Sequence, residues 1–153
     1  GAVMSPFNAF LMARGLKTLD IRMERHCANA QKVAEFLAAH PAVEKVYYPG
    51  LADHPGHDIA AKQMSDFGGM LSFEVKGGRA AATKFLDNLK LLNIEVHVAD
   101  ARSCALHPAS TTHRQLTEEQ LEACGVKPEQ VRLSIGIENI EDILADLDQA
   151  LRA

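Results

Sequence analysis

Residues 131–147 read VRLSIGIENIEDILADL, and the spacing of their apolar positions changes partway through this stretch. At its start, apolar residues alternate with Arg132 and Ser134, which predicts a strand with one buried face. Asn139 is suited to cap the helix that follows. The packing face of that helix is expected to consist of Ile140, Ile143, Leu144, Leu147 and Leu151. A strand that leads directly into a helix is typical of a layered α/β domain.

Strand and helix patterns alternate along the preceding residues as well. Strands are predicted over 43–48, 71–75, 91–98 and 104–106, and helices over 58–64, 80–89 and 117–124. Thr117 and Gln120 form a capping box at the start of the last of these helices. The segment 107–113 is expected to be a loop, because its proline and hydroxyl residues favour turns. The alternation predicts the α/β fold class.

The N-terminal part has a helical pattern over 6–40 that ends before Pro41, because a proline disfavours helix at the residue before it. Gly15 is expected to break or kink this helix. Apolar residues recur at steps of three or four, which predicts a face that packs against a core or a partner. The predicted organisation is a long connecting helix over 1–40 and a domain over 41–153.

Composition and charge exclude several classes of protein. The 153 residues suffice for one domain with a real core. The net charge of -4 leaves no basic surplus for binding nucleic acid, and no apolar run reaches the roughly 18 residues that a membrane span needs. Cys27, Cys104 and Cys124 are odd in number and lack CxxC spacing, which disfavours disulfides and a zinc knuckle. These features favour a reducing, cytoplasmic setting.

Few residues suggest chemistry by their own spacing. Arg132 is predicted to lie mid-strand, where a guanidinium can bind a carboxylate or phosphate, although pairing with an Asp or Glu is the commoner outcome. The two histidine pairs, His54 with His57 and His107 with His113, have no cysteine nearby and favour loop residues that bond to backbone, so no metal is expected. The cysteines are expected to be small buried residues.

Six motifs, in this order, resemble the C-terminal part of the Cys/Met-metabolism family of pyridoxal-phosphate enzymes. They are SPFNA at 5–9, RGLKTL at 14–19, RMERH at 22–26, YYPGL at 47–51, HPASTTH at 107–113 and RLSIGIE at 132–138. The resemblance covers essentially the whole chain, and residues 115–121 and 138–143 look most like the O-acetylhomoserine sulfhydrylases. It implies the C-terminal domain of the aspartate aminotransferase-like fold, with a small mixed sheet and helices packed on one side.

The resemblance also implies roles for particular residues. Arg132 corresponds to the arginine that binds the α-carboxylate of the amino-acid substrate. The segment 96–100 lies beside the same carboxylate in relatives, which makes Val96 and His97 the other expected substrate-binding residues. His97 stands where relatives usually have Ser or Asn; its ring can still donate a hydrogen bond. No catalytic residue is expected in this chain.

The groups that hold the cofactor in this family have no counterpart here. The family carries pyridoxal phosphate on a lysine in a Ser-x-Thr-Lys context. Lys84 follows Ala-Thr in a superficially similar way, but the surrounding pattern predicts an amphipathic helix with Lys84 facing solvent. We therefore expect pyridoxal phosphate in a longer parent protein and none bound to this chain. The expected partners are the parent's own cofactor domain, the other subunits of a homo-oligomer and a small amino acid.

For the parent, the resemblance implies a γ-replacement, in which acetate leaves Cγ of O-acetyl-L-homoserine and sulfide or a thiol adds to give homocysteine or methionine. Two alternatives within the family remain open, namely γ-elimination as in methionine γ-lyase and an activity of the cystathionine γ-synthase type. An alternative of another class is a non-catalytic binding or assembly module that uses the apolar face of the N-terminal helix.

Overall fold

A five-stranded mixed sheet forms the centre of the computed structural model, which describes residues 2–153. The strand order is β1-β2-β5-β4-β3. The bounds are Val43–Tyr47 for β1, Met70–Val75 for β2, Asn93–Ile94 for β3, Cys104–Leu106 for β4 and Gln130–Ser134 for β5. All neighbouring strands are antiparallel except β3 and β4, which are parallel. The mixed sheet expected from the resemblance is confirmed.

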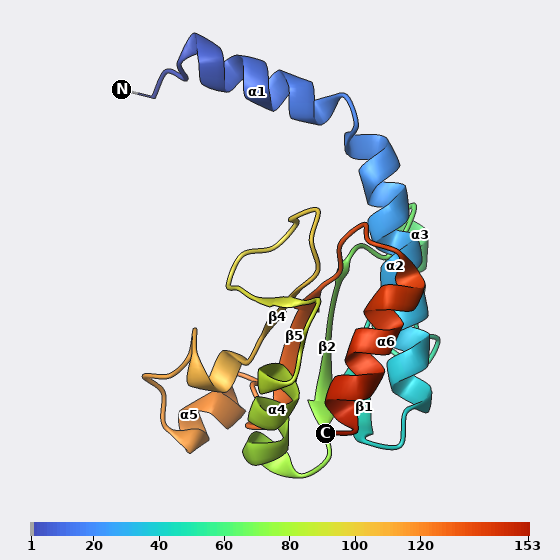
Figure 1. The fold of residues 1–153 in the computed structure, drawn as a ribbon, viewed down its shortest axis with the longest axis vertical. Coiled ribbons are helices and arrows are strands. Elements are labelled where there is room, and N and C mark those ends of the chain that lie inside the picture. Colours follow the sequence, from blue (N-terminus) through green and yellow to red (C-terminus); the bar gives the residue numbers. More distant parts are fainter. Residues whose placement is uncertain (1) are drawn as a thin grey trace.

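The helices are α1 Pro6–Leu16, α2 Leu19–Ala39, α3 His57–Gln63, α4 Gly78–Asp87, α5 Glu118–Ala123 and α6 Ile140–Leu151, with a 3-10 turn η1 at Pro108–Ser110. Helices α2, α4 and α6 pack on one face of this sheet, as the resemblance implied. Figure 1 shows α2, α4 and α6 beside the sheet, and their apolar side chains form one core with those of the strands. Phe73 and Leu133 lie in the middle of that core and are fully buried.

The ends of the helices follow the local signals in the sequence. The side chain of Asn139 accepts a hydrogen bond from the Glu141 N–H at the start of α6. Thr117 and Gln120 form the predicted capping box of α5. These contacts satisfy N–H groups that the first turn of a helix leaves without partners. The strand pairing then sets β5 beside β2 and β4, at the middle of the sheet.

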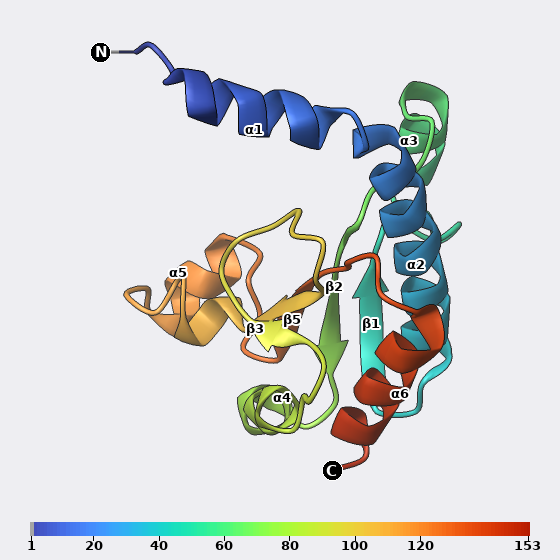
Figure 2. The same cartoon turned by 45° about the horizontal axis from the view of Figure 1, so that its top comes forward.

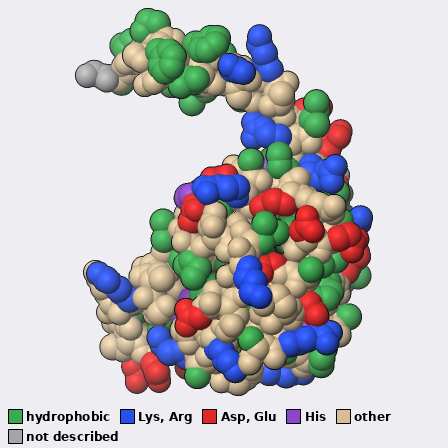
Figure 3. Space-filling model, in the orientation of Figure 1, with side chains coloured by type: hydrophobic (Ala, Val, Ile, Leu, Met, Phe, Trp, Pro, Cys, Tyr) green, Lys and Arg blue, Asp and Glu red, His purple; other side chains and the backbone are tan. Residues whose placement is uncertain are grey.

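The predicted helix over 6–40 is two helices, α1 and α2. The break falls at Lys17 and Thr18 and not at Gly15, which remains inside α1. The Gly15 carbonyl accepts a hydrogen bond from Arg22 Nη2 at 2.8 Å across the break. Figure 2 shows α1 extending away from the body of the molecule, and Figure 3 shows hydrophobic side chains gathered on it. Within residues 2–153, no helix combines the length and apolar character that a membrane crossing needs.

The prediction of a strand over 91–98 is largely wrong, since β3 spans only Asn93–Ile94. The buried carboxylate of Asp146 on α6 accepts hydrogen bonds from the N–H groups of Lys90, Leu91 and Leu92, at 2.8–3.0 Å. Those groups are therefore unavailable to a β-ladder. After Glu95, whose N–H donates to the Ala105 carbonyl at 3.2 Å, the chain leaves β4 and forms an irregular segment over 96–103.

Candidate functional site

Arg132 lies in the middle of β5 and points to the face of the sheet opposite the helices. Its neighbours across the strands are Ser72 on β2 and Leu106 on β4. The guanidinium is partly exposed, and its Nη2 donates a hydrogen bond to the carbonyl of Val96 at 2.7 Å. No Asp or Glu of residues 2–153 forms an ion pair with it. The positive charge is thus held on a rigid strand without a carboxylate of its own.

The segment 96–103 is fixed over the end of β5 by hydrogen bonds. Ser134, two residues after Arg132, accepts a hydrogen bond on Oγ from the Ala99 N–H at 3.1 Å. Ala99 has a φ of 64°, in the left-handed region that costs a non-glycine residue about 1 kcal/mol. The Ile137 N–H donates to the Ala101 carbonyl at 2.9 Å. These contacts hold the segment that presents the Val96 carbonyl to Arg132.

Close packing behind the segment requires a glycine at position 136. A Cβ at Gly136 would overlap the Ala101 carbonyl and stand 2.6 Å from the Arg102 carbonyl carbon. The Gly136 N–H donates to the Ser103 hydroxyl at 2.8 Å, and that hydroxyl donates to the Glu138 carboxylate at 3.0 Å. Strand β5 and the irregular segment therefore approach each other backbone to backbone.

The ring of His97 lies among charged groups of the same segment. Its Nε2 is 2.8 Å from the nearer carboxylate oxygen of Glu95 and 3.1 Å from that of Asp100. Arg102 approaches the same two carboxylates at 3.4 and 3.3 Å. Hydrogen bonds from the Arg102 backbone and side chain hold the pKa of the Asp100 carboxyl well below its usual range. The structure places no hydrogen bond between His97 and Arg132.

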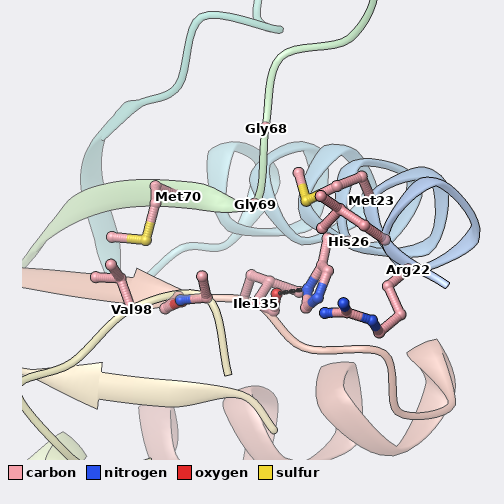
Figure 4. Close-up of a pocket in the computed structure, with 11 residues that line it drawn as sticks. Arg22, Met23, His26, Gly68, Gly69, Met70, Val98 and Ile135 are labelled. Atoms are coloured by element: carbon pink, nitrogen blue, oxygen red, sulfur yellow. Dashed lines mark hydrogen bonds between the residues drawn. The ribbon is translucent and has the colours of Figure 1, made fainter. Parts of the chain in front are cut away.

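An apolar cavity of about 300 Å³ adjoins the segment on the side of α2 (Figure 4). Gly68, Gly69, Met70, Val98 and Ile135 are among the residues that line it. Its two basic side chains are already committed to backbone carbonyls. Arg22 donates to Gly15 at 2.8 Å, and His26 Nδ1 lies 2.6 Å from the Ile135 carbonyl. The cavity therefore offers apolar contact more than charge.

The other histidines singled out in the sequence bond locally. His54 Nδ1 accepts from the Gly56 N–H at 3.1 Å, and His57 Nδ1 lies 2.7 Å from the Pro49 carbonyl. His107 is buried, with one ring nitrogen 2.7 Å from the Pro128 carbonyl and the other 2.7 Å from the Ser110 hydroxyl. His113 Nδ1 lies 2.9 Å from the Thr112 hydroxyl. Bonding to backbone is thus confirmed for His54, His57 and His107.

The cysteines and Lys84 match the sequence analysis with one exception. Cys27 and Cys104 are buried and free, on α2 and β4. Cys124 is exposed at the end of α5, so the expectation of burial was wrong there. A short helix with only Leu121 buried leaves its last turn in solvent. Lys84 is exposed on α4, as predicted.

Sequence reasoning missed the cluster of Glu95, Asp100, Arg102 and Cys104 around His97. Burial, followed by the carboxylates of Glu95 and Asp100, raises the pKa of the Cys104 thiol. The alternation of Glu95 and His97 was a signal that both could lie on one side of the chain. Their approach to Cys104 depends on the pairing of β3 with β4, which no local pattern reveals.

The residues around Arg132 do not fit the attachment of pyridoxal phosphate. The apolar cavity beside α2 has no lysine among its lining residues, and neither does the hollow lined by residues 94–97, Leu106 and Thr111. Lys84 belongs to α4, a helix that packs on the covered side of the sheet. Around Arg132, the described residues thus offer a guanidinium without an ion-pair partner and no lysine in the two adjoining hollows.

Comparison with known proteins identifies the class. A family model described as Cys/Met metabolism PLP-dependent enzyme matches residues 1–152. An L-methionine gamma-lyase of Fusobacterium nucleatum subsp. polymorphum is 56% identical over 99% of this chain and 38% of its own length. An O-acetyl-L-homoserine sulfhydrylase of Leptospira meyeri is 50% identical over 99% of this chain and 35% of its own length.

A solved structure agrees with these relatives. The crystal structure assigned as an O-acetylhomoserine (thiol)-lyase from Campylobacter jejuni, which holds an N'-pyridoxyl-lysine-5'-monophosphate, superposes with a TM-score of 0.93 at 42% identity. The match covers 100% of this chain and 37% of that one. The chain therefore belongs to the Cys/Met-metabolism family of PLP-dependent enzymes, and it spans a little over a third of the length of the curated relatives it matches.

Proposed function

We propose that this chain is the C-terminal part of a PLP-dependent enzyme of sulfur amino-acid metabolism and that Arg132 binds the α-carboxylate of the substrate. The observation that carries the proposal is the guanidinium on β5, which has a backbone carbonyl as its partner and no carboxylate. A fixed guanidinium binds a carboxylate through two parallel N–H···O bonds. The family supplies the substrate class, because its members act on amino acids.

The neighbouring residues would position this arginine and the substrate. The Val96 carbonyl holds Nη2 and so fixes the plane of the guanidinium. Ser134 holds the Ala99 N–H and so fixes the segment that carries Val96. His97 is exposed beside this segment and would donate a hydrogen bond to the substrate from its ring. Such positioning contributes to rate by restricting the substrate to a reactive orientation.

The cofactor belongs to the parent and lies outside the residues that this chain contributes. Pyridoxal phosphate, when bound there, supplies the electron sink for breaking bonds at the amino acid. We propose residues 1–40 as the connection to that cofactor domain and 41–153 as the substrate-binding domain. The exposed apolar side chains of α1, which include Phe7 and Phe10, would pack against the cofactor domain or another subunit of a homo-oligomer. We place the parent in the cytoplasm.

For the reaction, we propose γ-replacement on an O-acylated homoserine, as in the Leptospira meyeri relative. The second candidate is γ-elimination from methionine, which is favoured by the 56% identity to the Fusobacterium gamma-lyase. Both reactions would use the contact between Arg132 and the substrate carboxylate. They differ in the last reactant, because a thiol adds to the substrate in replacement, whereas water completes elimination. An assay of the full-length protein separates them. Homocysteine formed from O-acetyl-L-homoserine and sulfide indicates replacement, whereas 2-oxobutanoate and methanethiol formed from L-methionine indicate elimination.

Replacement of Arg132 tests the carboxylate contact. In the full-length enzyme, Arg132→Ala should lower kcat/KM by about 10²- to 10³-fold, which is about 3–4 kcal/mol of lost transition-state binding. Arg132→Lys keeps the charge but not the two-pronged geometry, and it should recover only part of this loss. Arg79→Ala, on α4, is the matched control and should leave kcat/KM unchanged. An unchanged kcat/KM in Arg132→Ala would contradict the assignment.

A cofactor titration tests the alternative that the chain acts alone as a binding or assembly module. The 153-residue chain is mixed with pyridoxal phosphate and treated with borohydride, and modified lysines are mapped. Diffuse, substoichiometric labelling is expected if the cofactor belongs to a larger parent. One stoichiometric lysine would show that this chain carries its own cofactor site. A reading frame for a cofactor domain directly upstream supports the parent enzyme, and its absence supports the free-standing module.

A further inference from the structure

Three side chains of different chemistry meet beside the end of β3. Glu95, His97 and Cys104 each direct one ligand-type atom into a space where these atoms all lie within 4.8 Å of one another. Cys104 is buried, Glu95 is partly buried and His97 is exposed. The cluster therefore has a closed side on the sheet and an open side through which an ion can enter.

The fold brings these residues together from two adjacent strands. In the parallel pair β3–β4, Asn93 lies opposite Cys104, so both side chains share a face of the sheet. Glu95 follows Asn93 by two residues and lies on the same side of the strand. Beyond a bend at Val96, the ring of His97 returns to Glu95, with Nε2 2.8 Å from its carboxylate. The Glu95 N–H still bonds the Ala105 carbonyl at 3.2 Å, which keeps this end of the strand attached to β4.

We propose that Glu95, His97 and Cys104 form a binding site for a zinc-type divalent metal ion. A thiolate, an imidazole and a carboxylate are the ligand types that zinc takes in proteins, at about 2.0–2.3 Å. Three protein ligands leave one tetrahedral position for Asp100 or a water molecule. The nearer Asp100 oxygen lies 3.1 Å from His97 Nε2, so a small movement of its side chain completes the set.

Charge supports a divalent ion at this place. Glu95 and Asp100 carry two negative charges, and Arg102, which contacts both carboxylates, carries one positive charge. The thiolate that Cys104 forms on binding adds a third negative charge. A divalent ion brings the local sum to zero. On binding, the Sγ–H bond of Cys104 breaks, its proton goes to solvent and a sulfur–metal bond forms without any change of oxidation state. Without metal, His97 Nε2 faces the Glu95 and Asp100 carboxylates and carries the proton of these contacts. On binding, that proton also goes to solvent, the ring keeps a proton on Nδ1 only, and Nε2 bonds the ion.

Val96 lies in the sequence between two of the proposed ligands, Glu95 and His97. The Val96 carbonyl is the partner of Arg132 at 2.7 Å. A bound ion would restrict residues 95–97 and so the arginine that faces them. This consequence for substrate binding rests on the proposed function, whereas metal binding itself does not.

The test measures zinc affinity directly in the full-length protein after treatment with a chelator. Zinc is titrated in competition with a chromophoric chelator, and cobalt is added separately to detect sulfur ligation in the difference spectrum. We expect one zinc per chain and a cobalt–thiolate absorption band. Cys104→Ser and His97→Asn should each weaken zinc binding by at least about 10- to 100-fold, the range known for groups that only support a metal ligand. Cys124→Ser removes an exposed thiol outside the cluster, so this variant should bind zinc as tightly as the unsubstituted full-length protein does.

Two results would overturn the proposal. One is a zinc affinity that is the same in the unsubstituted protein, in Cys104→Ser and in His97→Asn. The cluster would then be a network of ion pairs that does not bind metal. The other is cobalt binding without a thiolate band. His97 is exposed, so His97→Asn is expected to fold even if the buried Cys104→Ser variant does not. Neither readout depends on catalytic activity, so the metal site and the proposed enzyme function can fail separately.

Discussion

The two faces of the sheet are built in different ways. On the covered face, Phe73, Val131 and Leu133 are fully buried against helices, and apolar contact is their main interaction. On the open face, Arg132 and Ser134 bond to the backbone of an irregular segment. The same strand, β5, supplies both sets of side chains. Alternation along one strand therefore directs apolar side chains into the core on one face and polar side chains toward the irregular segment on the other.

This difference predicts which changes affect folding and which affect binding. Burial of apolar area stabilises a core roughly in proportion to the area removed from water. Ser72 and Arg132, on the opposite face, are only partly buried, and their polar atoms exchange water for protein partners at a small net gain. Substitutions on the covered face should thus lower the free energy of unfolding most strongly.

The largest loss of stability is expected for Phe73→Ala on β2. The Phe73 ring is fully buried and meets the Phe85 ring edge to face, with centroids 5.5 Å apart. Its removal leaves a cavity, so the free energy of unfolding should fall by about 3–5 kcal/mol. Urea denaturation measures this change. Ser72→Ala, one residue earlier and on the open face, should cost less than about 1.5 kcal/mol. Equal losses in the two variants would contradict the division between the faces.

An intermediate loss of stability is expected for Gly136→Ala. Gly136 lies just after β5, where the chain packs against the irregular segment. The new Cβ would overlap the backbone at Ala101 and Arg102, so overpacking should cost about 1–3 kcal/mol. The segment must move, and the Val96 carbonyl with it, so substrate affinity of the full-length enzyme should also fall. Gly15→Ala is the control, since a Cβ there meets nothing within 4 Å. Unchanged stability and affinity in Gly136→Ala would show that the segment adjusts freely.

The smallest change in the free energy of unfolding is expected for a substitution on α1, a helix that extends away from the sheet. Phe10 is 57% exposed, so Phe10→Ser should change the free energy of unfolding by less than about 0.5 kcal/mol. In the full-length parent, the same change should weaken assembly, measured by size-exclusion chromatography, if α1 packs against another domain or subunit. Ala38→Ser, on an exposed position of α2 outside that surface, is the control. Unaltered assembly in Phe10→Ser would argue against α1 as an interface.

Much of the fold follows from local signals in the sequence. The alternation around Arg132 predicted β5, and the caps at Thr117 and Asn139 predicted the starts of α5 and α6, because both kinds of signal act over a few residues. The predicted strand over 91–98 does not begin at residue 91, because Asp146, more than 50 residues away, takes the N–H groups of 90–92. At its other end, β3 stops at Ile94 and the chain bends at Val96. No propensity along 91–98 contains that information.

In the candidate site, too, some residues follow from local signals and others depend on distant parts of the chain. Alternation predicted that Arg132 faces away from the core, and the family resemblance pointed to the segment with Val96 and His97. The cluster of His97 with Glu95 and Cys104 was not predicted, because it depends on the parallel pairing of β3 with β4. Pairing between strands is decided by the whole sheet, so residues that meet across it lie beyond local patterns.

The hydrogen bonds from Lys90, Leu91 and Leu92 to Asp146 join the middle of the chain to its last helix. During synthesis, residues 90–92 leave the ribosome well before residue 146. Until α6 docks, their N–H groups have only water as a partner, and the segment that follows lacks its anchor. The irregular segment 96–103 therefore follows a stretch of chain that stays without this anchor until α6 is in place. A nascent or shortened chain that ends before Asp146 contains all five strands and still lacks that anchor.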